Sequence, residues 1–504
     1  MPNIENKLNK RERYKAQMRP YDYFQELETL GFENLGEGDR YFLQDFGIFN
    51  AEFSEEEFTL RLRIPGGRLS AQKLQQLAKI VTAHDLRMIM TVRAGIQLHG
   101  LEADNILEVF KQVNAIGITT WQSFGDNIRN IVTDVFDGVG RYSEIEVYPI
   151  VMQMQEHILK NPRYVGMLPR RISVGISGNS ANVISLFAND LYLALARKEG
   201  KLGFNVYMGG KNTEVAQDAD IFLLSSEVIT FFRAFVEAFY LHGSRFSRAN
   251  TRLFYLIEKI GMEGFKALIQ TEYAKTFESG GELLLEKGCF CEYETLKDGS
   301  YAFCYQTDFG RISAGELEEI AHYSADKEAE IRFGIDQNIY LIGLKERDCA
   351  LQSPKTSGTI IACAGSDYCP YSFWSIKDET SYLPLAKINE HRIQVGFSGC
   401  AKGCGRHRHT DIGLIGLKTG QFGAAEGGAR LFIGAEYTEG LSVGRTLFSM
   451  VPLQHLHSLV VLIIALYEKS GFDDFEAFSS QVLSRFSADF LALWLLANLQ
   501  CGQV

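Results

Sequence analysis

Apolar residues recur three and four positions apart in residues 74–81, a spacing that is typical of an amphipathic helix. Two short apolar runs follow, near residues 88–92 and 95–98, and they predict a pair of strands. Helices and strands mixed at this spacing indicate small α+β sandwiches.

Apolar patterning elsewhere predicts a second kind of unit. Residues 172–176 and 393–397 have the pattern of strands that end at glycine turns. Residues 229–274 and 453–499 are predicted to be mostly helical. The longest strongly apolar stretch, 459–467, has nine residues. A bilayer span needs about 20, so we expect a buried helix there and no membrane segment.

The chain contains an internal repeat in the order A, B, A′, B′. Residues 67–71, Gly-Arg-Leu-Ser-Ala, recur as residues 310–314, Gly-Arg-Ile-Ser-Ala, and the register continues without a gap to the end of each A unit. Residues 171–178 match residues 392–399 in the same way. The pattern predicts two homologous halves joined between about residues 270 and 300.

The two halves differ at positions where chemistry would occur. Arg93 aligns with Asp336, and Asn179 aligns with Cys400. These differences suggest a division of labour in which one half presents cations and the other presents thiols. Neutral drift after duplication is the alternative.

Composition narrows the class of protein. The chain has 504 residues, is 46% hydrophobic and 22% charged, and so is long enough for more than one ordinary domain. Its net charge of −11 argues against general nucleic-acid binding. The N-terminus lacks the apolar core of a secretory signal, and we expect a cytoplasmic protein. Six basic residues among the first 20 predict a solvated arm, with a docking surface as the alternative.

Four cysteines form two closely spaced pairs. Five residues separate Cys363 from Cys369, and three separate Cys400 from Cys404. Both pairs lie in glycine-rich turns, which allow several thiolates to converge. Four thiolates suit an iron–sulfur cluster or zinc, and the five-residue gap disfavours zinc. Buried, unreactive cysteines are the remaining alternative.

The other chemistry-bearing side chains are ambiguous. Cys289, Cys291 and Cys304 suggest either a second metal site or unliganded thiols on a hairpin, and we favour the thiols. His407 and His409 could be metal ligands, but in the basic run Arg-His-Arg-His we favour contact with carboxylates of a cofactor. Cys349 and Cys501 are predicted to be structural.

The cysteine pattern resembles a known signature. Cys-x5-Cys followed by Gly-Cys-x3-Cys-Gly-Arg is similar to the signature of the assimilatory sulfite and nitrite reductases. Similarity to this family runs from about residue 55 to about residue 435. Four further segments resemble its motifs: 62–68 (Leu-Arg-Ile-Pro-Gly-Gly-Arg), 125–130 (Gly-Asp-Asn-Ile-Arg-Asn), 168–171 (Leu-Pro-Arg-Arg) and 203–206 (Gly-Phe-Asn-Val).

The resemblance implies a duplicated α+β fold with pseudo-twofold architecture. It would contain two ferredoxin-like half-domains and two siroheme/4Fe–4S α+β domains. The implied boundaries are 1–52 for the N-terminal arm, 53–115 and 276–350 for the half-domains, 116–275 for the siroheme-site domain and 351–504 for the 4Fe–4S/siroheme domain.

The resemblance also implies two cofactors. Cys363, Cys369, Cys400 and Cys404 would bind a 4Fe–4S cluster, and Cys404 would also bridge the cluster to the iron of siroheme. Siroheme carries eight carboxylates, so its pocket must be rich in arginine and in backbone N–H donors. The implied siroheme contacts, besides Cys404, are Asn127, Arg170 and Arg406.

The implied reaction is a six-electron reduction of a small oxyanion, nitrite or sulfite. Arg93, Arg129 and Arg171 would face the anion, hold it and order waters that carry protons, because arginine does not readily deprotonate. No flavin-binding or nicotinamide-binding segment is evident, so electrons would come from ferredoxin or from a flavoprotein subunit.

The sequence departs from the family at positions that bear on the substrate. Arg171 replaces a lysine, and Ser173 occupies a position that is lysine in sulfite reductases and often asparagine in nitrite reductases. Ala401-Lys402 replaces Pro-Asn, which should not affect cluster ligation. Sulfite is substantially a dianion near neutral pH and gains more from each added cation than nitrite does. The missing lysine at Ser173, itself counted among the catalytic positions, therefore favours nitrite.

Two other functions remain open. Some cobalamin-pathway oxygenases resemble the same family and use this fold for tetrapyrrole chemistry, although Arg93 and Arg129 favour the reductase. A non-enzymatic iron–sulfur electron carrier would not need an arginine-lined pocket.

Overall fold

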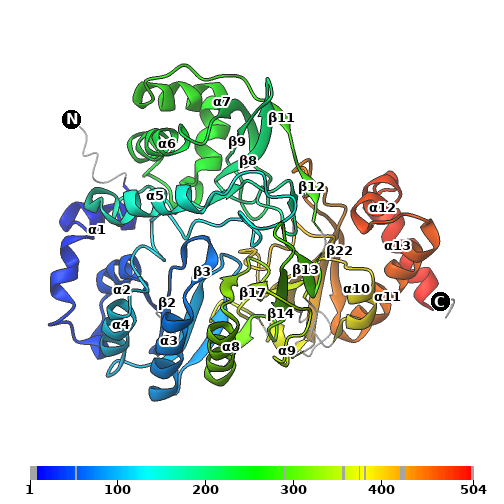
Figure 1. The fold of residues 1–504 in the computed structure, drawn as a ribbon, viewed down its shortest axis with the longest axis horizontal. Helices are drawn as coiled ribbons and strands as arrows, with labels where there is room; N and C mark the ends of the chain where they lie inside the picture. The colour runs from blue at the N-terminus through cyan, green and yellow to red at the C-terminus, as the bar shows by residue number, and fades with distance from the viewer. Residues whose placement is uncertain are drawn as a thin grey trace.

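The computed structural model describes residues 8–51, 54–288, 290–354, 358–373, 375–379, 382–419 and 426–500. This part of the chain forms four five-stranded sheets and a two-stranded one, with helices packed around them (Figure 1). Two of the large sheets come from the A repeats and two from the B repeats.

The two A-repeat sheets exchange a strand with each other. The first has the order β1 (Ile48–Ala51), β2 (Ser54–Arg61), β5 (Ile96–Leu101), β4 (Arg87–Met90), β15 (Arg311–Ile312). The second has the order β13 (Tyr293–Thr295), β14 (Tyr301–Tyr305), β17 (Ile339–Leu344), β16 (Glu330–Phe333), β3 (Arg68–Leu69). Strand β3 thus completes the sheet of the second half, and β15 completes that of the first. The halves are interlocked and share one hydrophobic core.

The repeated Gly-Arg-x-Ser-Ala motif explains this exchange locally. Its glycine, Gly67 or Gly310, has a positive φ of 74° or 85° and turns the chain into the swapped strand. A Cβ at Gly67 would lie 2.2 Å from the carbonyl oxygen of Phe333 in the other half. The serine then caps a helix: Ser70 accepts from a backbone N–H of α3 (Ala71–Ala83), and Ser313 does so for α8 (Ala314–Lys327). Helices α3 and α8 pack side by side (Figure 1).

The two B-repeat sheets share a common arrangement. The first contains β10 (Gln217–Leu223), β9 (Lys201–Met208), β8 (Leu191–Lys198) and β11 (Glu282–Leu283), and β6 (Val174–Ser177) pairs in parallel with β8. The second has the order β18 (Ile360–Ala362), β19 (Val395–Ser398), β20 (Ile412–Thr419), β21 (Glu426–Ile433), β22 (Arg445–Pro452). Strands β6, β8, β9 and β10 of the first correspond to β19, β20, β21 and β22 of the second. A short parallel pair, β7 (Ala181–Asn182) and β12 (Glu286–Lys287), ties the linker between the halves to the first B unit.

Helices cover the sheets and complete three hydrophobic cores, one for the joined A units and one for each B unit. In the first B unit these are α5 (Tyr148–Leu159), α6 (Val228–His242) and α7 (Leu253–Glu272), and in the second α11 (Leu453–Ser470), α12 (Phe475–Gln481) and α13 (Ala488–Gln500) (Figure 1). The remaining helices are α1 (Lys10–Gln17), α2 (Glu37–Leu43), α4 (Ile106–Ala115), α9 (Ile376–Glu379) and α10 (Leu385–Glu390).

The predicted elements and the duplicated α+β fold are confirmed. Residues 74–81 lie in α3, the runs near 88–92 and 95–98 form β4 and β5, and the two glycine-ended runs form β6 and β19. Both long helical segments are present, and the apolar stretch 459–467 lies in α11 with most of its side chains buried. Within the described part of the chain, no single helix has the length and apolarity for a bilayer span, and one bent pair, Phe475–Arg485 with Ala488–Leu499, meets that test only jointly.

The prediction of a solvated arm at the N-terminus is confirmed only in part, because Lys10, Arg13 and Arg19 are exposed whereas other charged side chains are buried. Glu12 and Lys15 of α1 are 6% and 5% exposed, and they pair with Arg245 and Asp126 of the first B unit. Further along the segment, Leu43 and Phe46 are fully buried and β1 joins the first sheet. Charge by itself predicted solvation for the whole segment, whereas long-range partners hold Glu12 and Lys15 in the interior.

The hairpin that was expected near the extra cysteines is formed by β13 and β14. Cys304 lies on β14, is 1% exposed and is close to Tyr340, while Cys291 precedes β13. Cys289 and Cys501 lie outside the described residues.

Candidate active site

Arginine side chains from five separate segments converge between the halves. Arg93 lies in the turn between β4 and β5, Arg129 in the loop before α5, and Arg171 directly before β6. Arg406 follows β19 in the second half, and Arg252 stands at the start of α7. All five positions lie in loops or at the boundaries of elements, and the fold gathers their side chains although they are far apart in sequence.

Their mutual repulsion is visible in the pKa values. Burial, together with the charges of Arg406 and Arg171, lowers the pKa of Arg93 to about 9. Burial also lowers the pKa of Arg171, with Arg252 adding to the effect, and lowers that of Arg129 well below its usual range. A bound anion would relieve this repulsion, so the cluster fits a cofactor and a substrate that carry negative charge.

The three predicted substrate-facing arginines are held to different degrees. Arg129 donates to the carbonyl oxygens of Ser123 and Gly125 in its own loop. Arg93 donates to Oδ1 of Asn189 at 3.2 Å. Among the described residues, the Arg171 guanidinium makes no hydrogen bond and no ion pair. Its five N–H donors therefore remain available to a ligand.

Sequence reasoning missed a further arginine. Arg61, at the end of β2, lies with its guanidinium 3.8 Å from the centre of the Phe124 ring. Burial lowers its pKa to about 10, while negative charge on Cys404 and Cys369 acts in the opposite direction. Arg61 therefore connects the arginine cluster to the cysteines. The signal was present in the Leu-Arg-Leu-Arg run, whose other arginine, Arg63, is buried and holds the carbonyl oxygens of Ile128 and Arg129.

Two buried carboxylates that the sequence did not single out balance part of this charge. Asp126 receives both terminal nitrogens of Arg248, at 2.7 and 2.8 Å, and lies 3.8 Å from Arg170. Asp190 receives Arg252 at 2.7 Å. Both carboxylates are fully buried. Their position in clusters of arginine, rather than any local motif, identifies them.

Ser173 and Asn127 make their hydrogen bonds inside the protein. The Ser173 hydroxyl donates to Asp190 at 2.6 Å. The Asn127 amide donates to Asp45 at 2.6 Å and accepts from the backbone N–H of Gly166 at 2.7 Å. Asn127 thereby joins the 125–130 loop to the segment that leads to Arg170 and Arg171.

The four cysteines converge because of a parallel strand pair. Strands β18 and β19 run in parallel with Ala362 opposite Phe397, so the chain leaves both strands at the same edge. Cys363 follows β18 directly, and the Gly399 N–H donates to its sulfur at 3.0 Å. Cys369 lies close enough to Cys400 and Cys404 for their charges to interact.

The chemistry of the four thiols fits a 4Fe–4S cluster. Within the described ranges, no three His, Cys, Asp or Glu side chains converge as closely as one metal ion requires. A 4Fe–4S cluster takes one thiolate per iron and so spreads its ligands further apart. Burial raises the pKa of Cys363 to about 12 and also raises that of Cys369, so thiolates there need a bound cation.

The two histidines next to the cysteines do not supply positive charge. Burial lowers the pKa of His407 to about 3 and that of His409 to about 4, so both are neutral near pH 7. His407 pairs with the Ser398 hydroxyl at 3.0 Å, and His409 pairs with the Lys211 carbonyl at 3.0 Å. Each ring thus has one partner inside the protein, and the favoured contact of this run with cofactor carboxylates stays a prediction. Arg406 and Arg408 are the charged members of the run, and Arg406 donates to the Ser185 carbonyl at 2.5 Å.

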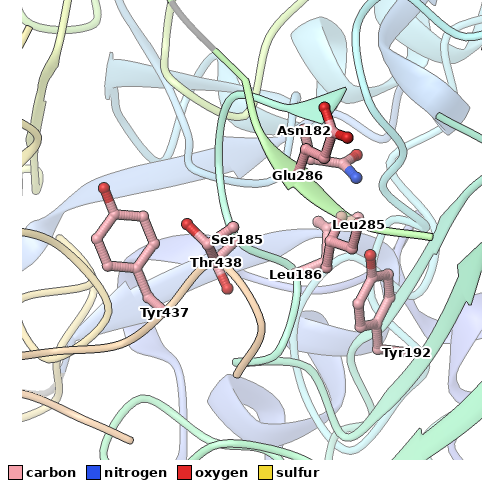
Figure 2. Close-up of a pocket in the computed structure, with 8 residues that line it drawn as sticks. All are labelled: Asn182, Ser185, Leu186, Tyr192, Leu285, Glu286, Tyr437 and Thr438. Atoms are coloured by element: carbon pink, nitrogen blue, oxygen red, sulfur yellow. The ribbon is translucent and has the colours of Figure 1, made fainter. Parts of the chain in front are cut away.

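Two cavities lie outside this cluster. The first, of about 10 Å³, has room for one water and lies where the halves meet (Figure 2). Its lining is Asn182, Ser185, Leu186, Tyr192, Leu285, Glu286, Tyr437 and Thr438. The second, of about 680 Å³, opens between the end of α6 and α7 and contains none of the predicted site residues.

Comparison with known proteins agrees with this geometry. Residues 54–116 match the nitrite/sulfite reductase ferredoxin-like half domain, and residues 124–277 match the nitrite and sulphite reductase 4Fe–4S domain. The four cysteines lie outside both matched segments, so their grouping is independent of the matches.

Similar proteins extend over nearly the whole chain. A ferredoxin–nitrite reductase of Synechococcus elongatus is 28% identical over 89% of this chain and 94% of its own length. A chloroplastic ferredoxin–nitrite reductase of Arabidopsis thaliana is 24% identical over 91% of this chain and 86% of its own length. The structure of the Mycobacterium tuberculosis NirA protein has the same fold, with a TM-score of 0.86 at 21% identity over 96% of this chain and 97% of that one. The chain therefore carries two domains of the nitrite and sulfite reductases and is similar over nearly its whole length to members of this family of oxidoreductases, whose expected cofactors are siroheme and a 4Fe–4S cluster.

Proposed function

We propose that the protein reduces nitrite to ammonia, with ferredoxin as the electron donor. The choice of nitrite over sulfite rests on the hydrogen bonding of Ser173. Its hydroxyl is bonded to Asp190, so this position adds no cation to the pocket, and the neighbouring carboxylate removes charge from it. A pocket with fewer net positive charges favours a monoanion over a dianion. The relatives above are named as ferredoxin–nitrite reductases, which supports both the substrate and the donor.

In this proposal the three arginines act on the anion. Arg171, with its free donors, would bind the anion directly, and Arg93 and Arg129 would complete the positive surface. Positive charge placed in advance lowers the cost of charge that develops as oxygen leaves as water. Because arginine retains its proton, ordered waters between these side chains would deliver the protons.

The cofactors would be held by both halves. Arg170 and Arg406 would contact siroheme carboxylates, and Asn127 would act by holding the loop that carries Arg129. Cys363, Cys369, Cys400 and Cys404 would ligate the cluster, with Cys404 as the bridging thiolate. The siroheme and the 4Fe–4S cluster together would supply the electrons for reduction of the anion. The domain boundaries implied by the resemblance, like these residue roles, stay a prediction.

Two measurements on the purified protein test the proposal. The absorption spectrum should show the strong visible bands of siroheme, whereas a cluster alone gives only a broad shoulder. Steady-state kinetics with a reduced viologen should give a higher kcat/KM for nitrite than for sulfite. A higher value for sulfite would refute the choice of substrate, and a spectrum without siroheme bands would refute the reductase.

A further inference from the structure

The segment before the two matched domains packs against the site. Residues 8–51 precede the half-domain match, which starts at residue 54. Asn9 caps α1 and also donates to the Arg245 carbonyl at 2.7 Å, so the helix is attached at its first turn. Arg245 in turn pairs with Glu12 at 2.6 Å.

Lys15 of α1 touches both segments that carry the predicted anion-binding arginines. Its ammonium donates to the Leu168 carbonyl at 2.7 Å and lies 3.2 Å from the Asp126 carboxylate. Leu168 precedes Arg171 by three residues, and Asp126 precedes Arg129 by three. Glu12 accepts from the same ammonium at 2.7 Å, so the cation is paired on all sides although it is buried.

Asp126 is the group that Lys15 stabilises. Burial alone would raise the pKa of Asp126, but the charges of Lys15 and Arg248 outweigh burial and hold that pKa below its usual range. Without Lys15, a buried carboxylate in the loop would lose one of its two main cations. Breaking such a pair is costly, because it leaves charge buried and incompletely compensated.

Asp45 makes a second contact from the same N-terminal segment. Its carboxylate accepts from Asn127 at 2.6 Å, and its carbonyl accepts from the Gln122 N–H at 2.7 Å. A Cβ at Gly125 would lie 2.5 Å from one Asp45 oxygen, and a Cβ at Gly166 would lie 2.6 Å from the other. Asp45 is therefore wedged between the loop that leads to Arg129 and the segment that leads to Arg171.

We propose that residues 8–51 act as a clamp on the anion pocket, in which Lys15 and Asp45 are positioning residues for Arg129 and Arg171. The inference rests on the proposed function, since it concerns the same pocket. The clamp touches neither arginine side chain. It holds the backbone three residues before Arg171, and the Asp126 and Asn127 side chains just before Arg129. A shift of about 1 Å in such groups can cost on the order of 10²-fold in rate.

The test uses the purified holoenzyme with Lys15→Met, and Lys10→Met as the matched control on the same helix. Lys10 is exposed and pairs with exposed Glu37. Hydrogen exchange should accelerate in residues 122–131 and 164–172 of Lys15→Met, and KM for nitrite should rise by roughly 10-fold or more. Lys10→Met should match the wild type in both, and Lys15→Arg should restore part of the affinity.

Two results would overturn the clamp. The first is wild-type hydrogen exchange and wild-type KM in Lys15→Met, whether or not its melting temperature falls. If Lys15→Met does not fold, Asp45→Ala provides the same readout at residues 122–131, and unchanged exchange there would be the second. Failure of the proposed function gives a different result, because the wild type itself would then show no nitrite turnover. The comparison of hydrogen exchange between Lys15→Met and the wild type would still test the clamp.

Discussion

The hydroxyl of Ser173 donates a 2.6 Å hydrogen bond to Oδ2 of Asp190, and the Ser173 backbone N–H donates to the same oxygen at 2.8 Å. The other oxygen of Asp190 receives Arg252 at 2.7 Å. Asp190 also counteracts the lowering of the pKa of Arg93 and of Arg171, so its negative charge reaches the anion-binding cluster. Position 173 therefore lies directly beside the carboxylate that reduces the net positive charge of the pocket.

Ser173→Lys should shift specificity towards sulfite. The new ammonium would meet Asp190, offset its charge and make the pocket more positive, which helps a dianion more than a monoanion. The ratio of kcat/KM for sulfite to that for nitrite is the measurement, and we expect it to rise. Ser173→Asn, which adds no charge, is the matched control. An equal change in both variants would show that size rather than charge is responsible.

Arg93→Ala should leave both cofactors in place and reduce nitrite turnover by about 10²–10³-fold, the usual effect of losing one electrostatic partner in a water-poor site. Cofactor content is measured from the visible spectrum and turnover with a reduced viologen. Arg87→Ala is the control, because Arg87 is exposed and pairs with Glu57 on the surface. A cofactor-free Arg93→Ala protein would instead make this arginine a siroheme contact.

Cys404→Ser should abolish turnover. This thiolate is the proposed bridge between cluster and siroheme, and a serine hydroxyl is a poor substitute for it. Activity and the visible spectrum are the measurements, with Cys349→Ser as the control outside the cluster. Full activity with a normal spectrum in Cys404→Ser would remove this residue from the site.

Asp45→Asn should change how stability depends on pH. Burial raises the pKa of Asp45 to about 7, opposed by the hydrogen bond from Asn127, whereas the unfolded chain has an ordinary value of 3.8. The native state then binds the extra proton, so this stabilisation is complete below about pH 4 and is lost as pH rises through 7. Asparagine does not titrate, and its carbonyl can still accept from Asn127.

Melting temperatures from pH 5 to 8 test this expectation. Wild type should lose stability relative to Asp45→Asn as pH rises to about 7, and the difference should then level off. Parallel curves across the range would mean that the Asp45 carboxyl is ionised throughout. Other titrating groups, such as Asp134, are common to both proteins and cancel in the difference.

Features that depend on short-range spacing were predictable from the sequence by itself. The helix at residues 74–81, the glycine-ended strands and the A, B, A′, B′ repeat all follow from local periodicity and turn chemistry. The cysteine pairs were also evident, because ligands in glycine turns have a characteristic spacing. The fold class follows from these features, whereas the family and the cofactors came from the resemblance of the cysteine pattern to a known signature.

Tertiary structure alone decided which charges meet. The exchange of β3 and β15 between sheets, the place of Arg61 between arginines and cysteines, and the burial of Lys15 against Asp126 all join segments more than 50 residues apart. A basic residue in a polar N-terminal run has the same local pattern whether it is solvated or buried. Whether such a residue is buried depends on whether a distant carboxylate offsets the free-energy cost of removing its charge from water. Only the folded chain brings the Asp126 carboxylate within 3.2 Å of Lys15.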